Sequence, residues 1–188
     1  KLNINFLSTG FDVVSIEFLV KLGVDRIKIP SGEITNAPLL EHISKLKLPI
    51  ILSTGMSTID NIKKALILLK KNELNNNHIT ILQCNSSYPT DYVDINLNVM
   101  QSLKSIFDVN VGLSDHTIGY EVPIAAVALG ASVIEKHFTL DKSLSGPDHK
   151  ASLNPCELKS FIESIRKTDI ALGSKIKKPS QNELRNRD

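Results

Sequence analysis

Two histidines stand directly behind strand-like runs of apolar residues, at a spacing that suits a shared metal ion. His116 follows VGLSD, His137 follows SVIEK, and a polar GPDH segment at 146–149 comes shortly afterwards. Strand ends at one rim of a parallel barrel converge, so side chains about twenty residues apart in sequence can meet there. Two neutral imidazoles with nearby carboxylates suit Mn, Fe or Zn and leave positions open for water and substrate. The pair therefore predicts a metal site, although a histidine taken alone is more often a satisfied loop residue.

A second candidate site centres on Lys28, which lies inside the strand-like run RIKIPS at 26–31. A lysine inside a barrel strand costs free energy unless an anion or a carboxylate pairs with it. Hydroxyl groups that would help Lys28 to hold a phosphate or a carboxylate stand at the ends of other strand-like runs: Thr9, Ser31 and Ser114. A structural ion pair between Lys28 and Glu33 or Glu135 explains the residue equally well, so both interpretations stay open.

The elements that must position these residues alternate between strand and helix signals along the chain. This alternation predicts an α/β fold with a parallel sheet whose connections are helices. Six strand candidates are rich in β-branched residues and end in polar ones: 4–9, 26–31, 49–54, 79–84, 110–114 and 132–138. Polar endings on all of them indicate one shared pocket at the carboxyl rim. Because a complete barrel of eight units needs roughly 250 residues, a chain of 188 residues predicts an incomplete one.

Helix signals between the strand candidates include two N-terminal caps. Ser57 with Asp60 three residues on predicts one helix start, and Asn154 with Glu157 predicts another. Apolar stripes of Leu and Ile follow both caps, as expected of helices that cover a sheet. We therefore expect these helices to form the core rather than a cofactor or partner site.

The composition excludes several classes of function. The 22 basic and 20 acidic residues are spread along the chain and give a formal net charge of +2. Without a basic cluster, neither nucleic acid nor a membrane surface is expected as a partner. No apolar run approaches the ~20 residues that span a bilayer, and Cys84 and Cys156 have no metal-binding or redox spacing. We expect a cytoplasmic protein and, since the chain begins with Lys1, a piece of a longer one.

Six sequence motifs together cover nearly the whole chain. They are IKIPSGE at 27–33, ILSTGM at 51–56, CNSSYPT at 84–90, VGLSDHT at 111–117, ALGASVIEKHFTLD at 128–141 and GPDHKASL at 146–153. In this order they resemble the sialic acid synthase family, which includes N-acetylneuraminate synthases and their legionaminic and pseudaminic acid relatives. The resemblance implies a (β/α)8 TIM barrel followed by an antifreeze-like domain. Residues 1–173 would supply strands 3 to 8 of the barrel, without its first two β/α units, and 174–188 a linker towards the C-terminal domain.

The resemblance also implies a reaction. Family members condense phosphoenolpyruvate with an N-acylated hexosamine and release phosphate by C–O cleavage. On this basis the expected transferase reaction converts N-acetylmannosamine to N-acetylneuraminate with a divalent metal, Mn²⁺ first and Mg²⁺ or Co²⁺ as alternatives. The full-length protein is expected to be a homodimer. Family residues from the first two strands and from a partner's antifreeze-like domain complete the site, so the chain alone is expected to be inactive.

The same resemblance implies roles for particular residues. His116 and His137 match the two metal ligands, while Glu33, Tyr88 and Asp148 match the residues closest to the chemistry. Glu33 and Asp148 would contact the acceptor sugar. The remaining substrate-binding residues would hold phosphoenolpyruvate, chiefly its phosphate, together with Tyr88: Thr9, Lys28, Ser31, Ser86 and Ser114. Ser86 stands where some members have asparagine.

Two other functions remain open on the sequence. One is a synthase for a different nonulosonic acid, legionaminic or pseudaminic, because the motifs do not separate the acceptors. The other is a non-catalytic barrel that binds a metal or a sugar phosphate. The intact set of His116, His137, Lys28 and Asp148 argues against the second, because a degenerate site would be free to lose some of them.

Overall fold

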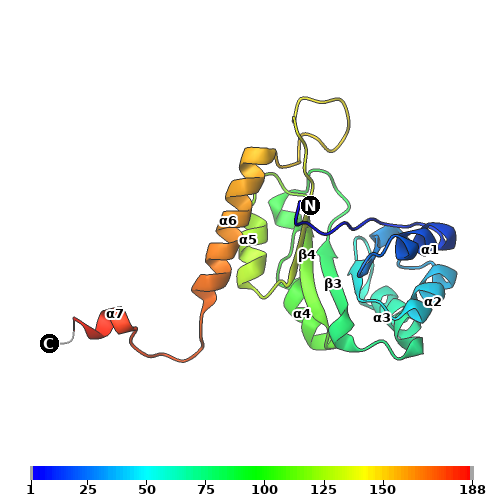
Figure 1. Cartoon of the computed structure of the whole chain (residues 1–188), viewed down its shortest axis with the longest axis horizontal. Coiled ribbons are helices and arrows are strands. Elements are labelled where there is room, and N and C mark those ends of the chain that lie inside the picture. Colours follow the sequence, from blue (N-terminus) through cyan, green and yellow to red (C-terminus); the bar gives the residue numbers. More distant parts are fainter. Residues whose placement is uncertain (1, 187–188) are drawn as a thin grey trace.

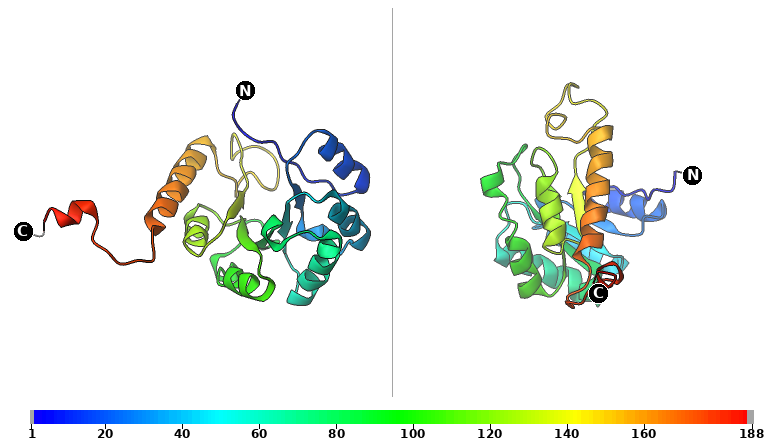
Figure 2. Two further views of the ribbon diagram at one scale, coloured as in Figure 1. Left: turned by 60° about the horizontal axis from the view of Figure 1, so that its bottom comes forward. Right: turned by 90° about the vertical axis from the view of Figure 1, so that its left-hand side faces the viewer.

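A computed structural model describes residues 2–186. Five parallel strands pair in chain order and curl into half of a barrel, with helices on the outer side (Figures 1 and 2). The strands are β1 (Ile27–Ile29), β2 (Ile50–Ser53), β3 (Ile79–Cys84), β4 (Asn110–Asp115) and β5 (Val133–Lys136). The helices are α1 (Val13–Lys21), α2 (Ala37–Leu46), α3 (Ile59–Leu69), α4 (Val99–Phe107), α5 (Glu121–Ala128), α6 (Pro155–Leu172) and α7 (Gln181–Leu184). Short 3₁₀ helices cover Ser31–Glu33, Lys70–Asn72, Asn76–His78 and Tyr92–Asp94. The predicted partial α/β barrel is confirmed.

One strand prediction is wrong, because residues 4–9 do not form a ladder. Only Thr9 pairs, through an isolated parallel bridge to Lys28. Ile4 and Phe6 are 81% and 63% exposed, so the segment buries little apolar surface along this edge of the half-barrel. A segment that gains neither burial nor repeated hydrogen bonds has little to hold it as a strand. The described sheet therefore has five strands instead of the six expected.

The two faces of the sheet differ in character because successive side chains of a strand point to opposite sides. One face is apolar and packs against the helices, with rows of partnered residues that are at most 2% exposed: Ile27, Ile50 and Ile79, then Ile29, Leu52, Ile81 and Val111. The other face carries buried polar side chains, including Lys28, Ser53 and Ser114. The hydrophobic core therefore lies between strands and helices, and the concave interior is lined by polar side chains that could bind a ligand.

Capping boxes begin two of the helices that flank this sheet, α3 and α6. The predicted box at Asn154 and Glu157 is confirmed at the start of α6 by two reciprocal hydrogen bonds of 2.9 Å. The other prediction is wrong by one residue, since Thr58 caps α3 with Asn61 and Ser57 lies just outside. Both spacings fit the same pattern of capping residues, so the sequence alone did not separate them.

Residues beyond α6 leave the half-barrel and end in the short helix α7, at the end of the chain opposite α1 in Figure 1. Their role as a linker stays a prediction. Within residues 2–186, none of the helices combines the length and apolar character needed to cross a membrane.

A glycine permits the close approach of the last two strands. Gly112 in β4 is the register partner of Val133 in β5. A Cβ atom added at Gly112 would lie 2.3 Å from the carbonyl oxygen of Val133 and 2.7 Å from the Cδ2 atom of Leu82. Real Cβ atoms do not approach backbone this closely, so a side chain here must push the strands apart.

We expect Gly112→Ala to lower the free energy of unfolding by about 1–3 kcal/mol, the usual cost of overpacking a well-packed interior. Urea titration followed by circular dichroism measures it. Gly32→Ala is the matched control, because a Cβ there meets nothing within 4 Å. Equal stability of the two variants would show that β4 and β5 can separate without cost.

Candidate active site

The ends of β4 and β5 bring the two predicted metal ligands together. Asp115 and Lys136 are register partners at the last position of their strands, and a histidine follows each of them. Because side chains alternate, His116 and His137 then point to the same inner rim. Their ring centroids are 5.2 Å apart and the rings are inclined at 75°. The pairing predicted from the sequence is therefore present in the structure.

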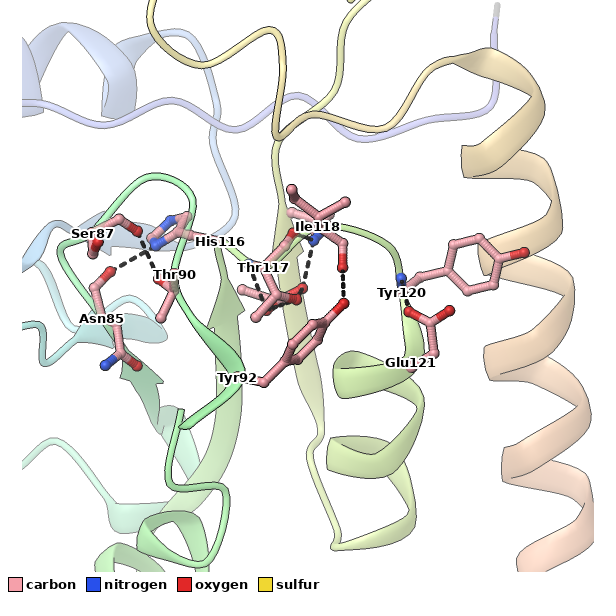
Figure 3. Close-up of polar contacts among 11 residues, drawn as sticks. Asn85, Ser87, Thr90, Tyr92, His116, Thr117, Ile118, Tyr120 and Glu121 are labelled. Atoms are coloured by element: carbon pink, nitrogen blue, oxygen red, sulfur yellow. Dashed lines mark hydrogen bonds and ion pairs between the residues drawn. The ribbon is translucent and has the colours of Figure 1, made fainter. Parts of the chain in front are cut away.

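A backbone carbonyl orients the His116 ring. Its Nδ1 atom lies 2.7 Å from the carbonyl oxygen of Asn85 (Figure 3). A carbonyl oxygen only accepts hydrogen bonds, so Nδ1 carries the proton and Nε2 keeps its lone pair. Burial lowers the pKa of His116 below its ordinary value, which favours the neutral ring. A neutral imidazole held in this way is the form that ligates metals.

Tyr88 and Asp148 complete a cluster around the histidines. The Tyr88 ring lies 4.1 Å from the His116 ring and 5.5 Å from the His137 ring, measured between centroids. The Asp148 Oδ2 atom is 3.7 Å from Nδ1 of His137. Burial raises the pKa of Tyr88, and the Asp148 carboxylate adds to the effect, so the phenol stays a hydrogen-bond donor at neutral pH. The structure thus brings together four of the predicted site residues.

The residues of this cluster fit a divalent metal with an open coordination sphere. Across residues 2–186, no three His, Cys, Asp or Glu side chains are arranged to hold an ion by themselves. His116 and His137 supply two nitrogen donors, and water or substrate oxygens would fill the other positions. The metal and its identity stay a prediction.

Lys28 belongs to a polar network on the concave face. Its Nζ atom donates to the Ser53 hydroxyl at 2.9 Å and lies 3.4 Å from Oε2 of Glu135. The other oxygen of Glu135 accepts a hydrogen bond of 2.6 Å from Ser114. Of the two ion-pair partners considered for Lys28, the structure shows Glu135 and not Glu33. The 3.4 Å separation exceeds the ~2.7–2.9 Å of a strong charge-assisted hydrogen bond, so the ammonium group can still bind an anion.

Two predicted substrate-binding hydroxyl groups converge beside the β2–α3 turn. A Cβ atom added at Gly55 would lie 2.6 Å from the Ser31 hydroxyl oxygen and 3.0 Å from that of Ser86. Gly55 also has a φ of +49°, which disfavours larger residues there. Thr9 reaches the same rim through its bridge to Lys28. Ser31 and Ser86 therefore lie together at the end of β2, while Ser114 lies in β4 and donates to Glu135.

Glu33 is less closely connected to the rest. It lies in a short 3₁₀ helix and accepts a hydrogen bond of 2.6 Å from the Asn36 side chain. In the part of the chain that the structure describes, no hydrogen bond or ion pair joins it to Asp148. Contact of both residues with one acceptor sugar stays a prediction.

Hydrogen bonds between two loops hold Tyr88 over the histidines. The backbone N–H of Thr90 donates to the His116 carbonyl oxygen at 2.9 Å, and the Tyr92 hydroxyl donates to the carbonyl oxygen of Ile118 at 2.8 Å (Figure 3). The loop after β3 is thereby joined to the loop after β4. Neither contact has a sequence signal, because backbone carbonyls accept them.

Sequence reasoning missed some residues that shape the site. Glu135 is expected from alternation to share a face with His137 and to pair with Lys28, and the structure adds that Ser114 donates to its other carboxylate oxygen. Asp115 stands in the sequence only as one of several polar strand endings and Lys136 has no signal of its own, yet the two form a buried ion pair of 2.6 Å directly before the two histidines. This pair could not be predicted from the sequence, because it depends on the register between β4 and β5.

Comparison with known proteins agrees with this geometry. The model of the NeuB family matches residues 1–177. The chain belongs to the NeuB family. This result confirms the resemblance that the six motifs carry.

Relatives in the family include synthases that are identical to the chain at about half of the aligned positions. An N,N'-diacetyllegionaminic acid synthase of Legionella pneumophila is 53% identical over 186 residues, which cover 97% of the chain and 52% of that protein. The Campylobacter jejuni enzyme of the same name is 54% identical, with 99% and 56% covered. The crystal structure of the Leptospira borgpetersenii N-acetylneuraminic acid synthetase superposes with a TM-score of 0.89 at 37% identity, covering 98% of the chain and 64% of its own. The chain spans about half the length of the curated relatives it matches.

The two cysteines should differ in reactivity. Cys84 ends β3 on the buried side of the site, and burial raises the pKa of its thiol, whereas Cys156 is exposed. Because the thiolate is the reacting form, we expect iodoacetamide at neutral pH to alkylate Cys84 about tenfold or more slowly than Cys156. Peptide mass spectrometry of the native protein measures both rates. Similar rates would mean that the rim around Cys84 is open to solvent.

Proposed function

We propose that this chain forms part of the barrel of a nonulosonic acid synthase, which joins phosphoenolpyruvate to an N-acylated sugar and releases phosphate. The convergence of His116, His137 and Tyr88 at one rim, next to the Lys28 network, carries this proposal. The names of the synthases in the family support it. Dimerisation and cytoplasmic location of the complete protein stay predictions.

The product that we propose is N,N'-diacetyllegionaminic acid. Two relatives at 53% and 54% identity carry that name, so this alternative is better supported than N-acetylneuraminate, the first expectation from the motifs. Phosphoenolpyruvate contains no nitrogen. Both acetamido groups of such a product must therefore come from the acceptor, which would be a diacetamido hexose.

Residues on the concave face would bind phosphoenolpyruvate. The Lys28 ammonium, which its long contact with Glu135 leaves only partly neutralised, would pair with the phosphate or carboxylate. The converging hydroxyls of Ser31 and Ser86 would donate hydrogen bonds to the same anion. Tyr88 would donate from its protonated phenol to a substrate oxygen above the histidine rings.

His116 and His137 would hold the divalent ion, Mn²⁺ with Mg²⁺ or Co²⁺ as alternatives. A metal in this position would supply Lewis-acid polarisation of the sugar carbonyl. His116 would offer Nε2, since the Asn85 carbonyl oxygen holds the proton on Nδ1. Asp148, half exposed beside His137, is placed to accept hydrogen bonds from sugar hydroxyls.

The bond changes of the proposed reaction are balanced by its substrates alone. The methylene carbon of phosphoenolpyruvate forms a carbon–carbon bond with the aldehyde carbon of the open-chain sugar, and the aldehyde oxygen takes up a proton to become a hydroxyl group. Water adds to the former enol carbon that carries the phosphate and gives up one proton. Phosphate then leaves by C–O cleavage while the new hydroxyl loses its proton, which forms the keto group of the product. The protein would hold the two carbons in line and stabilise the phosphate through Lys28.

We expect the product of the complete gene, with Mn²⁺, to release phosphate from phosphoenolpyruvate fastest with a diacetamido hexose. N-acetylmannosamine should be a poorer acceptor, and no acceptor should give background release. The 188-residue chain alone should release no phosphate above background. A colorimetric phosphate assay makes all these comparisons.

Two outcomes of this assay would change the proposal. Faster release with N-acetylmannosamine would restore N-acetylneuraminate as the product. No sugar-dependent release by folded protein that binds Mn²⁺ would contradict the synthase proposal and favour the non-catalytic barrel.

A further inference from the structure

We propose that the ion pair between Asp115 and Lys136 is a positioning device that fixes the two histidine rings relative to each other. The inference rests on the proposed function of His116 and His137 as metal ligands. It assigns a role to two residues that themselves lie outside the concave site.

The pair joins the ends of the two strands that carry the histidines. Lys136 Nζ lies 2.6 Å from Oδ2 of Asp115 and also donates to the Thr117 carbonyl oxygen. The other carboxylate oxygen of Asp115 accepts from the backbone N–H and the hydroxyl of Thr117, at 3.1 Å and 2.9 Å. The residues on both sides of His116 are thus bonded to each other and to the residue before His137.

Because of the direction of the side chains, the ion pair affects the positions of the histidine rings from the opposite face of the sheet. Asp115 and Lys136 are partners in the ladder, and their side chains point to the face opposite that of the following histidines. A shift or rotation at either strand end would therefore move a ring on the inner rim. With the outer side chains bonded, the backbones that carry the two rings are fixed relative to each other, and the ring centroids lie 5.2 Å apart.

Burial argues that the pair serves more than stability. The side chains of Lys136 and Asp115 are 4% and 0% exposed. Burying two charges costs desolvation free energy that their attraction hardly offsets, and apolar residues of similar volume often stabilise such a position equally well. What an apolar pair would lack is a directional bond across the strand ends. Directional bonds outside a metal's own ligands are known to orient ligating histidines.

A second lysine pair in the same region provides a control. Lys142 contacts Glu157 at the same distance, 2.6 Å, but the two side chains are 34% and 36% exposed. This pair joins the loop after β5 to the start of α6 and does not adjoin either histidine. Removing Lys142 therefore deletes a lysine charge and an ion pair in the same region, as removing Lys136 does, but it leaves the bond between the two strand ends intact.

The first test uses the full chain carrying Lys136→Met, which keeps the apolar stem and removes the charge. We expect its affinity for Mn²⁺, measured by electron paramagnetic resonance, to fall about 10- to 100-fold, the usual effect of losing a bond that orients a metal ligand. Lys142→Met should bind Mn²⁺ like the unchanged chain. Circular dichroism must show both variants folded at the assay temperature.

A metal-free measurement separates this inference from the proposed function. Nitrogen-15 spectra of the imidazole rings report the tautomer and environment of His116 and His137 without any metal. Lys136→Met should change the ring nitrogen shifts of both residues, and Lys142→Met should change neither. If the unchanged chain binds no Mn²⁺, the metal proposal fails, and these spectra still decide whether the ion pair positions the rings.

A double variant removes the buried charge left behind by the single one. Asp115→Asn with Lys136→Met leaves no unpaired charge, so it should fold even if Lys136→Met does not, and it should show the same loss of Mn²⁺ affinity and the same shift changes. Unchanged affinity and unchanged ring shifts in a folded variant would overturn the inference. So would unfolding of both variants, because that result would assign the pair to stability alone.

Discussion

The register between β4 and β5 is the constraint on which the candidate site depends. Parallel pairing places Asp115 opposite Lys136, and alternation then turns the next residue of each strand to the inner rim. Gly112 allows the two backbones to approach each other three residues before this pair, opposite Val133. A slip of one residue would send one histidine to the helix-covered face, and the site would be lost.

A second constraint is that a charged side chain buried on the concave face needs polar partners. Lys28 is buried and contacts Ser53 closely but Glu135 only at 3.4 Å. Glu135 in turn is held by Ser114 through its other oxygen. In this arrangement the carboxylate neutralises the ammonium group only partly, so Lys28 can still pair with a further anion.

Much of the fold and part of the site could be predicted from the sequence, because they depend on local patterns. Buried strands are marked by runs of Ile, Leu and Val, and the α6 cap by Asn154 and Glu157. The same patterns fail where neighbours decide: residues 4–9 have strand composition but only Thr9 is paired. Motifs brought His116, His137 and Tyr88 into one hypothesis. The contacts that orient them come from the Asn85 carbonyl and from strand register. Neither depends on a particular residue type, so the sequence could not predict them.

The anomalous scattering of Mn²⁺ in crystals of the protein soaked with phosphoenolpyruvate tests the proposed site most directly. We expect one strong peak between the ring nitrogens of His116 and His137, with the ligand's phosphate or carboxylate against Lys28. A manganese peak elsewhere, or an anion bound without contact to Lys28, would contradict the proposed site.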